Sequence, residues 1–399
     1  MKHLLLSAAL LLSLTLGGQT APEPFSLTLV PTDEQKSSGQ PYILSPELPD
    51  GNYKVTVRLG DKKHSGSTTV RCESRRLFLN RVPTRKGEFK ELSFTVNKRN
   101  RCITPGDSVR TKSKETHRPV WDDRLSIEIN GPAPAIDKIT IEQAPESVTT
   151  VFLFGNSTVV DQANDPWCSW GQIVPHFFDE SVCVANYAES GESAHTSITA
   201  KRLKKALTHM KPGDYVFIEF GHNDQKQKNP GSGAYYSFAT ALKTFIDEIR
   251  LKGATPVLVT PTCRRRFNAE GEIQNTHGDY PDAMRWVAER EGVTLIELNP
   301  MTKMLYEALG TETSKKAFVH YPNGTFPGQN RALADDTHFN PYGATQVAKC
   351  VLTGIREQLP ALGSHIVGLG DYDPAHPDNP ELFAWDLSPY IDMSKPDGN

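Results

Sequence analysis

A serine, an aspartate and a histidine in this chain have the types and the spacing that nucleophilic catalysis requires. Ser157 comes directly after a short apolar run and a glycine, and Asp335 and His338 lie three residues apart far downstream. A carboxylate can hold one nitrogen of an imidazole while the other nitrogen removes the proton of a serine hydroxyl. The three residues are therefore candidates for a catalytic triad.

The same residues also have simpler interpretations. Serine is common as a helix N-cap, so Ser157 can merely begin the helix that follows the apolar run. An aspartate and a histidine at this spacing can ligate a metal, but the rest of a 2-His-1-carboxylate set is not apparent. The six cysteines form no C-x-x-C motif that would favour structural zinc. We therefore expect neither a metal nor an organic cofactor.

Two further residues stand at similar positions. Gly191 follows a second apolar run and Asn223 follows a third. The glycine can supply a positive φ in a turn, or its missing side chain can let a substrate oxygen reach the N–H group. The asparagine can close its strand as an Asx turn, or donate its amide to a developing oxyanion.

The elements that must position these residues follow from the hydrophobic period. Beyond residue 149 short apolar runs alternate with segments of helical spacing, which predicts βαβ units and a parallel sheet covered on both faces. The expected strands are 150–154, 182–187, 215–220, 256–260 and 293–297, and helices are expected around 238–249, after Asp279 and after Pro341. Ligands of such folds bind beyond the carboxyl ends of the strands, where the candidate residues lie.

The part of the chain before these units has a different period. Between residues 42 and 141 apolar and polar residues alternate, and turn signals such as Asp50-Gly51-Asn52 separate the runs. This pattern predicts an antiparallel β-sandwich. We expect a signal peptide at 1–21, the sandwich at 22–146, the α/β unit at 147–360 and an irregular tail at 361–399.

Composition limits the location and the partners of the protein. A cationic start followed by a leucine-rich run from Leu4 to Leu16 is typical of a secretory signal peptide and is too short to span a bilayer. We therefore expect an exported protein that is not inserted in the membrane after the signal is removed. Glycosylation of the N-x-T sequon at Asn156 would obstruct the site, which favours a bacterial source. The net charge of −3 over 399 residues gives no footprint for nucleic acid. The oligomeric state cannot be deduced.

The six cysteines are compatible with disulfides in an exported protein but are too sparse to form its scaffold. We expect a disulfide in each half of the chain, between cysteines that are close in sequence. The expected pairs are Cys72 with Cys102 and Cys168 with Cys183.

Taken together, the four blocks around Ser157, Gly191, Asn223 and Asp335-x-x-His338 resemble the SGNH (GDSL-like) hydrolase superfamily, over roughly residues 149–356. The resemblance implies a flavodoxin-like three-layer α/β/α fold with a five-stranded parallel sheet. It also implies that Ser157 is the nucleophile, His338 the general base and Asp335 its orienting carboxylate. The oxyanion hole would consist of the N–H groups of Ser157 and Gly191 and the amide of Asn223. One departure is Asn156, where the family usually has aspartate.

Longer stretches are similar to the rhamnogalacturonan acetylesterase branch of this superfamily. They read FLFGNSTVVDQ, NYAESGESAHTS, VTPTCRRRFNAEG, NTHGDYPDAMRWVA and DDTHFNPYGA. The resemblance implies a secreted serine esterase that removes acetyl groups from a plant cell-wall polysaccharide of the pectic class. The preceding sandwich resembles galactose-binding-like modules, so it either binds carbohydrate or only supports the esterase.

A few further residues are candidates for contacts with the substrate. Arg264 and Arg265 follow the fourth strand, and either can pair with a galacturonate carboxylate or simply form a solvated basic turn. His277, His195 and Trp170 are further candidates to line the groove, although a tryptophan is more often part of a core.

Three functions remain open at this point. The first is a polysaccharide acetylesterase, on rhamnogalacturonan or on xylan. The second is a lipase or thioesterase of the same superfamily, which would need an apolar acyl channel. The third is a noncatalytic glycan-binding protein, against which the complete Ser, Gly, Asn, Asp and His set argues.

Overall fold

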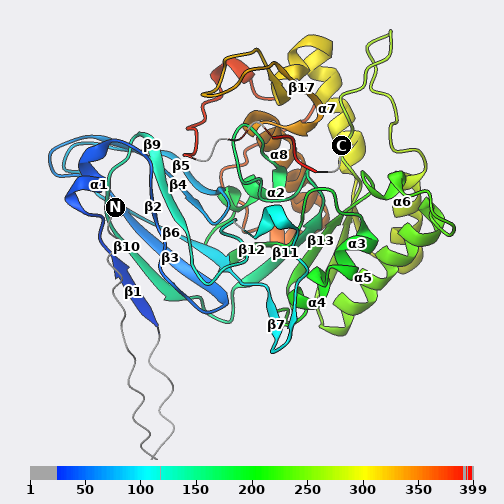
Figure 1. Cartoon of the computed structure of the whole chain (residues 1–399), viewed down its shortest axis with the longest axis horizontal. Coiled ribbons are helices and arrows are strands. Elements are labelled where there is room, and N and C mark those ends of the chain that lie inside the picture. Colours follow the sequence, from blue (N-terminus) through cyan, green and yellow to red (C-terminus); the bar gives the residue numbers. More distant parts are fainter. Residues whose placement is uncertain (1–24, 117, 390–391, 393, 398–399) are drawn as a thin grey trace, which may run out of the picture.

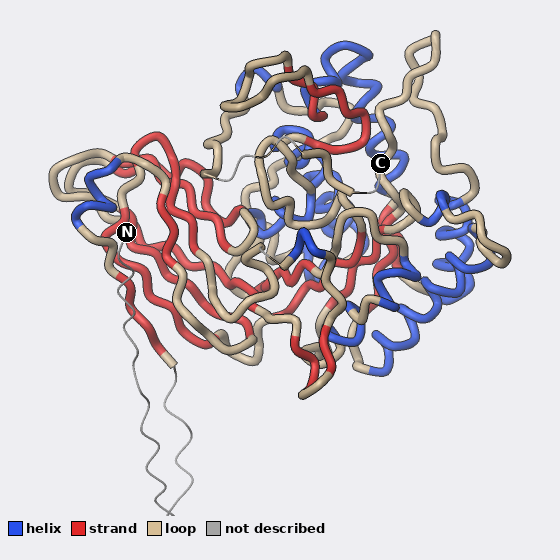
Figure 2. Tube along the Cα trace, viewed as in Figure 1, coloured by secondary structure: helices blue, strands red, loops and turns tan. Residues whose placement is uncertain are grey.

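The computed structural model describes residues 25–116, 118–389, 392 and 394–397, and the expected signal peptide lies outside them. Its centre is one nine-stranded mixed sheet, in the order β1-β10-β3-β6-β12-β11-β13-β14-β15 (Figure 1). The strands of the N-terminal half form one side of this sheet, and the strands of the α/β half form the other. Figure 2 shows the corresponding division, with helices concentrated around the second half.

The α/β half confirms the five predicted strands and their parallel arrangement. They are β11 (Thr149–Gly155), β12 (Val182–Asn186), β13 (Tyr215–Glu219), β14 (Thr255–Val259) and β15 (Thr294–Ile296). Neighbouring strands pair in parallel throughout, from β12 through β11, β13 and β14 to β15. Their residues are almost all buried, as expected for strands covered on both faces.

Helices cover both faces of this half. They are α2 (Trp170–Ile173), α3 (Ala194–Thr199), α4 (Arg202–Ala206), α5 (Ala239–Leu251), α6 (Tyr280–Glu291), α7 (Leu298–Thr313), α8 (Pro341–Gln358) and α9 (Pro360–Gly363). One buried cluster joins the sheet to α2, α7 and α8, and a second joins it to α3, α4, α5 and α6. Helix α6 has Pro281 in its first turn and ends at Gly292 in the left-handed conformation. The three-layer α/β/α arrangement is therefore confirmed.

The N-terminal half consists of two antiparallel sheets. One is the side of the central sheet formed by β1 (Ser26–Leu29), β10 (Ile136–Gln143), β3 (Gly51–Leu59) and β6 (Lys90–Lys98). The other contains β2 (Tyr42–Leu44), β9 (Ile127–Ala133), β4 (Gly66–Cys72) and β5 (Arg76–Thr84). Val55, Val96, Val70 and Ile129 belong to a shared core between them. The expected β-rich N-terminal region is thus present.

The N-terminal region and the α/β half are not independent domains with separate sheets, because they share the central sheet. Strand β6 pairs in parallel with β12, through Thr95 opposite Cys183 and Val96 opposite Val184. The antiparallel side therefore continues directly into the parallel side. Because β12 leads toward Gly191, the N-terminal region lies next to one of the strand ends that carry candidate residues.

The predicted disulfides are wrong. All six cysteines, each within the described residues, are free thiols. Cys183 is buried in β12, whereas Cys168 lies in a loop that bridges to Phe339, the last residue of β17 (Leu333–Phe339). Cys72 is buried at the end of β4, whereas Cys102 is exposed in a separate short strand, β7 (Cys102–Thr104). Proximity in sequence did not place either pair together.

No helix within the described ranges is long and apolar enough to cross a membrane. Among the residues described after α9, the chain has one further short helical turn, at Pro380–Leu382, and otherwise runs without regular structure. It nevertheless returns to the N-terminal sheet and then to the candidate site.

Candidate active site

The structure brings the three predicted triad residues together. Ser157 Oγ lies 2.9 Å from His338 Nε2, and His338 Nδ1 lies 2.8 Å from Asp335 Oδ2. All three residues are at least 97% buried, since their exposed fractions are 3%, 1% and 3%. With the Nδ1 hydrogen donated to the carboxylate, Nε2 is the nitrogen that accepts the serine hydroxyl. The histidine can therefore act as a base toward this serine.

Local turns hold the two ends of this array. Ser157 comes just after β11, where a Cβ on Gly155 would collide with Val159, so this position needs glycine. Asp335 Oδ1 accepts the backbone N–H groups of Thr337 and His338 at 2.9 and 3.0 Å. One carboxylate oxygen thus shapes the turn, and the other is left to orient the imidazole.

Hydrogen bonding keeps the Asp335 carboxylate charged. Burial alone would raise its pKa, but the side chain of His338 and the two backbone N–H groups of the turn together lower the pKa well below its usual range. A carboxylate that stays ionised can stabilise the imidazolium that forms when the histidine takes a proton.

Asn156 acts as a hydrogen-bond acceptor at the position where the family resemblance implies aspartate. Its side chain is completely buried, and Oδ1 accepts the backbone N–H of Thr158 at 3.1 Å and lies 3.1 Å from the Thr158 hydroxyl oxygen. The Asn156 Nδ2 group has no hydrogen-bond partner among the described residues. Burial also makes the sequon at Asn156 inaccessible to a glycan in the folded protein.

Gly191 and Asn223 lie at the ends of the next strands, as predicted. Gly191 has φ +77°, a left-handed conformation that favours glycine. The Asn223 amide donates to the carbonyl of Glu192, the residue after Gly191, at 3.0 Å. This bond joins the two predicted oxyanion donors into one wall of the site. Their role as oxyanion donors stays a prediction.

Glu219 was missed by the sequence interpretation, although a charged residue ending a buried strand is unusual. It is fully buried, and it accepts hydrogen bonds from the Thr158 hydroxyl at 3.0 Å and from Trp170 Nε1 at 2.7 Å. Burial raises its pKa to about 7, while these hydrogen bonds oppose the shift. Glu219 therefore supports the turn that carries Ser157.

Replacement of Glu219 by glutamine should remove part of the pH dependence of stability. Between about pH 4.5 and 7 this carboxyl is ionised when unfolded but protonated when folded, so the free energy of unfolding falls as pH rises through this window. We expect the wild-type stability relative to Glu219→Gln to fall by on the order of 2–3 kcal/mol from pH 4 to pH 8. Urea unfolding at several pH values measures it, with the exposed Glu312→Gln as control. A difference that is constant with pH contradicts the prediction.

Two other residues beside the triad also escaped the sequence interpretation. Gln162 Nε2 donates to the carbonyl of Ser157 at 2.8 Å, and the Trp167 ring meets the His338 ring edge-on at 5.7 Å. Both belong to the loop after the serine. Gln162 is the last residue of the FLFGNSTVVDQ stretch, and its closeness in sequence to Ser157 is the signal that could have identified it as a residue of the site.

The proposed substrate contacts separate into two groups. Arg264 lies 3.4 Å from His277 Nε2 and donates to the carbonyl of His222 at 3.3 Å, so Arg264 and His277 adjoin the block that carries Asn223. Arg265 instead pairs with Asp336 at 2.8 Å and donates to Ser314, so its guanidinium braces the triad loop.

Trp170 and His195 do not share a groove. Trp170 is 1% exposed and belongs to the core, as the alternative interpretation of a tryptophan at this position expected. His195 is exposed and lines a different hollow, together with Tyr235 and Tyr236.

Comparisons with known proteins place this site in a family context. A model of the GDSL-like lipase/acylhydrolase family matches residues 153–346, which include all the residues of the triad. The rhamnogalacturonan acetylesterase RhgT of Bacillus subtilis is 43% identical over 219 residues, covering 54% of this chain and 94% of that protein. The probable rhamnogalacturonan acetylesterase YesY of the same organism is 32% identical over 212 residues, covering 52% and 92%. A crystal structure of the Bacillus subtilis protein YxiM has a TM-score of 0.48 and 24% identity, covering 79% of this chain and 80% of that one.

Proposed function

Because the chain belongs to the GDSL-like lipase/acylhydrolase family and is a carbohydrate esterase, we propose that it removes O-acetyl groups from rhamnogalacturonan by acyl transfer through Ser157. The observation that carries the proposal is the hydrogen-bonded array of Ser157, His338 and Asp335. It lies within the region matched by the family model, and the relatives named for this reaction are similar over half of the chain.

In the first step Ser157 Oγ attacks the acetyl carbonyl carbon while His338 Nε2 takes the hydroxyl proton. The carbonyl oxygen becomes negatively charged, and the N–H groups of Ser157 and Gly191 with the Asn223 amide stabilise that charge. Each such donor contributes about 3–4 kcal/mol in the transition state. His338 then gives its proton to the departing sugar oxygen, which leaves an acetyl-serine.

In the second step water takes the place of the sugar hydroxyl. His338 removes a proton from this water, the hydroxide adds to the acetyl carbonyl, and the ester bond to Ser157 breaks. Acetate leaves and the serine regains its proton. Asp335 remains ionised throughout and compensates the charge of the imidazolium.

The surroundings favour a polar substrate over a long acyl chain. A cavity of about 480 Å³ beside the triad is lined by charged residues that include Lys114, Arg118, Lys395 and Asp397. A lipase or thioesterase would need an apolar channel for its acyl group.

Export by the signal peptide at 1–21 belongs to the proposal, because a cell-wall polymer lies outside the cell that makes the enzyme. So do the accessory role of the galactose-binding-like region at 22–146 and the catalytic unit at 147–360.

Acetate release tests the proposal directly. The wild-type enzyme would be compared on acetylated rhamnogalacturonan, acetylated xylan and p-nitrophenyl decanoate, with saponified rhamnogalacturonan as the blank. We expect preferential release from the acetylated pectic polymer. Hydrolysis of the long-chain ester without acetate release from either polymer would overturn the substrate class, and preference for xylan would overturn the choice of rhamnogalacturonan.

A further inference from the structure

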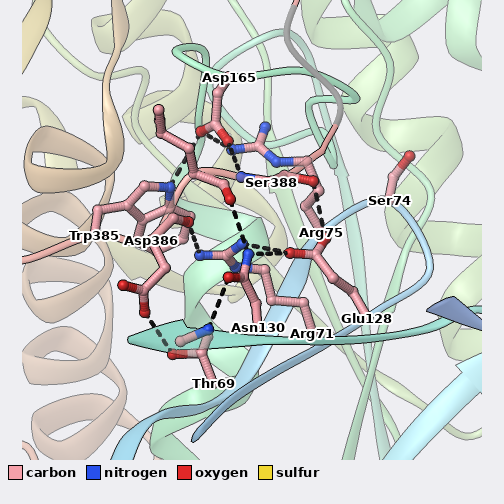
Figure 3. Close-up of polar contacts among 12 residues, drawn as sticks. Thr69, Arg71, Ser74, Arg75, Glu128, Asn130, Asp165, Trp385, Asp386 and Ser388 are labelled. Atoms are coloured by element: carbon pink, nitrogen blue, oxygen red, sulfur yellow. Dashed lines mark hydrogen bonds and ion pairs between the residues drawn. The ribbon is translucent and has the colours of Figure 1, made fainter. Parts of the chain in front are cut away.

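A buried aspartate fixes the C-terminal segment of the chain against the α/β half. Asp165 accepts hydrogen bonds from Trp385 Nε1 at 3.1 Å and from the Ser388 backbone N–H at 2.7 Å (Figure 3). It also forms an ion pair with Arg75, and both side chains of that pair are at least 99% buried. The Asp165 carboxylate thus connects the α/β half both to Arg75 of the N-terminal half and to the segment 385–388.

The N-terminal sheet provides a second set of contacts to this segment. Arg71 donates to Glu128 at 2.7 Å, and Glu128 accepts the Ser388 hydroxyl at 2.9 Å. The Arg71 guanidinium also lies over the Trp385 ring, 4.1 Å from its centroid. Figure 3 shows these side chains converging from β4, β9 and the C-terminal segment. Residues 385–388 are therefore an anchor within an otherwise irregular stretch.

From this anchor the chain reaches the triad. The Asp392 backbone N–H donates to the carbonyl of Asp165 at 3.2 Å, and the Asp392 carbonyl accepts from Trp167 Nε1 at 3.2 Å. Trp167 is the residue whose ring meets that of His338. Further on, Lys395 Nζ lies 3.3 Å from Asp335 Oδ2. The segment passes alongside the catalytic array.

Two residues later the segment reaches the oxyanion wall. A Cβ built on Gly191 would lie 3.1 Å from the Asp397 Cβ and 3.2 Å from Lys112 Nζ. Asp397 Oδ1 accepts from Lys114 Nζ at 2.7 Å. Lys395 therefore lies at the Asp335 carboxylate, and Asp397 lies beside Gly191.

The carboxylate of Asp397 pairs with Lys114, lines the same cavity as Arg118, and lies on the same side of Gly191 as Lys112 Nζ. Its hydrogen bond with Lys114, opposed by a small burial effect, and the charges of Lys112 and Arg118 lower its pKa. Lys112 also donates to the carbonyl of Ser190, and Arg118 also pairs with Glu189 at 3.2 Å, so the loop that carries both is fixed against the turn that carries Gly191. A carboxylate of the chain itself thus occupies a built cationic site at the mouth of the active site.

We propose that Lys112, Lys114 and Arg118 form a subsite for the carboxylate of an acidic sugar residue next to the acetylated one, and that Asp397 occupies this subsite in the free enzyme. The proposal deepens the proposed function and rests on it for the identity of the polymer, since a pectic chain carries uronic acid carboxylates. Displacement of Asp397 is inexpensive, because its ion pair with Lys114 joins side chains that are 40% and 57% exposed, and such pairs contribute little.

The test uses an acidic sugar that carries no acetyl group. Digalacturonic acid is added as an inhibitor of p-nitrophenyl acetate hydrolysis by the full-length protein, and the neutral disaccharide galactobiose is the control ligand. Inhibition constants are compared for the wild type, Lys114→Gln, Asp397→Asn and Lys315→Gln. The last variant removes an exposed lysine that pairs with Glu312 and lies outside the proposed subsite. Each inhibition constant is determined against the variant's own hydrolysis rate.

We expect digalacturonic acid to inhibit competitively and galactobiose to inhibit far less. Loss of a charge-assisted hydrogen bond should weaken inhibition of Lys114→Gln by about three- to tenfold. Asp397→Asn should be inhibited more strongly than the wild type, because the internal competitor has lost its charge. Lys315→Gln should match the wild type, and added salt should weaken inhibition of the wild type.

Equal inhibition by the neutral disaccharide would overturn the subsite, as would an unchanged constant for Lys114→Gln. Weaker or unchanged inhibition of Asp397→Asn would overturn the claim that Asp397 occupies the subsite. The assay needs no acetylated polymer, so its outcome is independent of acetate release. An enzyme that is inactive on rhamnogalacturonan but inhibited in the expected pattern would refute the proposed polymer and retain the acidic subsite.

Discussion

The replacement of Ser157 by alanine is expected to lower kcat for p-nitrophenyl acetate by about 10⁴- to 10⁶-fold, the range of losses when the nucleophile of a serine triad is removed. The physical reason is that His338 Nε2 then has no hydroxyl from which to take a proton, so no acyl-enzyme can form. The oxyanion donors remain in place, and they leave a small residual rate above that in water. Initial rates at saturating substrate measure the effect.

A matched control separates loss of chemistry from loss of fold. Ser364 is exposed, and its hydroxyl only donates to the carbonyl of Ala361, so Ser364→Ala should keep the wild-type rate. The free energy of unfolding of Ser157→Ala should stay within about 1 kcal/mol of the wild type, since one hydrogen bond is lost. An organophosphonate should modify the wild type stoichiometrically at Ser157 and leave the alanine variant unmodified. Undiminished turnover by Ser157→Ala would refute the mechanism.

The parts of this molecule that sequence could predict are those that local pattern determines. The five parallel strands each have a continuous apolar run, and Ser157, Gly191 and Asn223 follow three of them at the same edge of the sheet. The Asp335-x-x-His338 pair lies within β17, at the irregularity in its pairing with β16 (Phe318–Tyr321) and just before α8, so its spacing in sequence already keeps the two side chains close. Local patterns of this kind can be identified without knowing which distant segments contact one another.

The parts that sequence could not predict depend on long-range pairing of polar groups. Nothing in the alternating pattern of β6 indicates that it pairs with β12 rather than ending a separate sheet. Asp165 and Ser388 are 223 residues apart, and each resembles an ordinary loop residue. Three arginines around the turn from β4 to β5 resemble exposed charges in the sequence, yet Arg71, Arg75 and Arg76 are only 0%, 1% and 0% exposed. Burial of a charge is decided by its partner, which a single sequence does not identify.

The junction between β6 and β12 also changes what the N-terminal region does. The loop that carries Lys112 and Arg118 comes after β6 and the short strands that follow it. Because β6 pairs with β12, and β12 leads to Gly191, this loop lies beside the turn that carries Gly191. An independent sandwich on a linker could not hold these cations in a fixed position relative to that turn. The region therefore contributes residues to the mouth of the site, whether or not it binds carbohydrate elsewhere.

The replacement of Asp165 by alanine should have the largest effect on stability. Arg75 would be left as an uncompensated buried charge, and Trp385 and Ser388 would lose their acceptor. Removal of one partner of a buried ion pair costs about 3–5 kcal/mol in the free energy of unfolding. Urea unfolding monitored by tryptophan fluorescence measures the change, and limited proteolysis followed by mass spectrometry shows whether the segment from 385 onward becomes the first site of cleavage.

The matched control is Asp247→Ala, which also removes one carboxylate from an ion pair. Asp247 pairs with Lys243 one turn away on α5, and the two side chains are 51% and 45% exposed, so this change should cost no more than about 0.5 kcal/mol. A difference of several kcal/mol between the two variants would show that burial determines the energy of these pairs. It would also show that Asp165 holds the C-terminal segment in place over the triad. If both variants were destabilised equally and slightly, the segment would not be anchored through Asp165, and Lys395 and Asp397 would reach the site by other contacts.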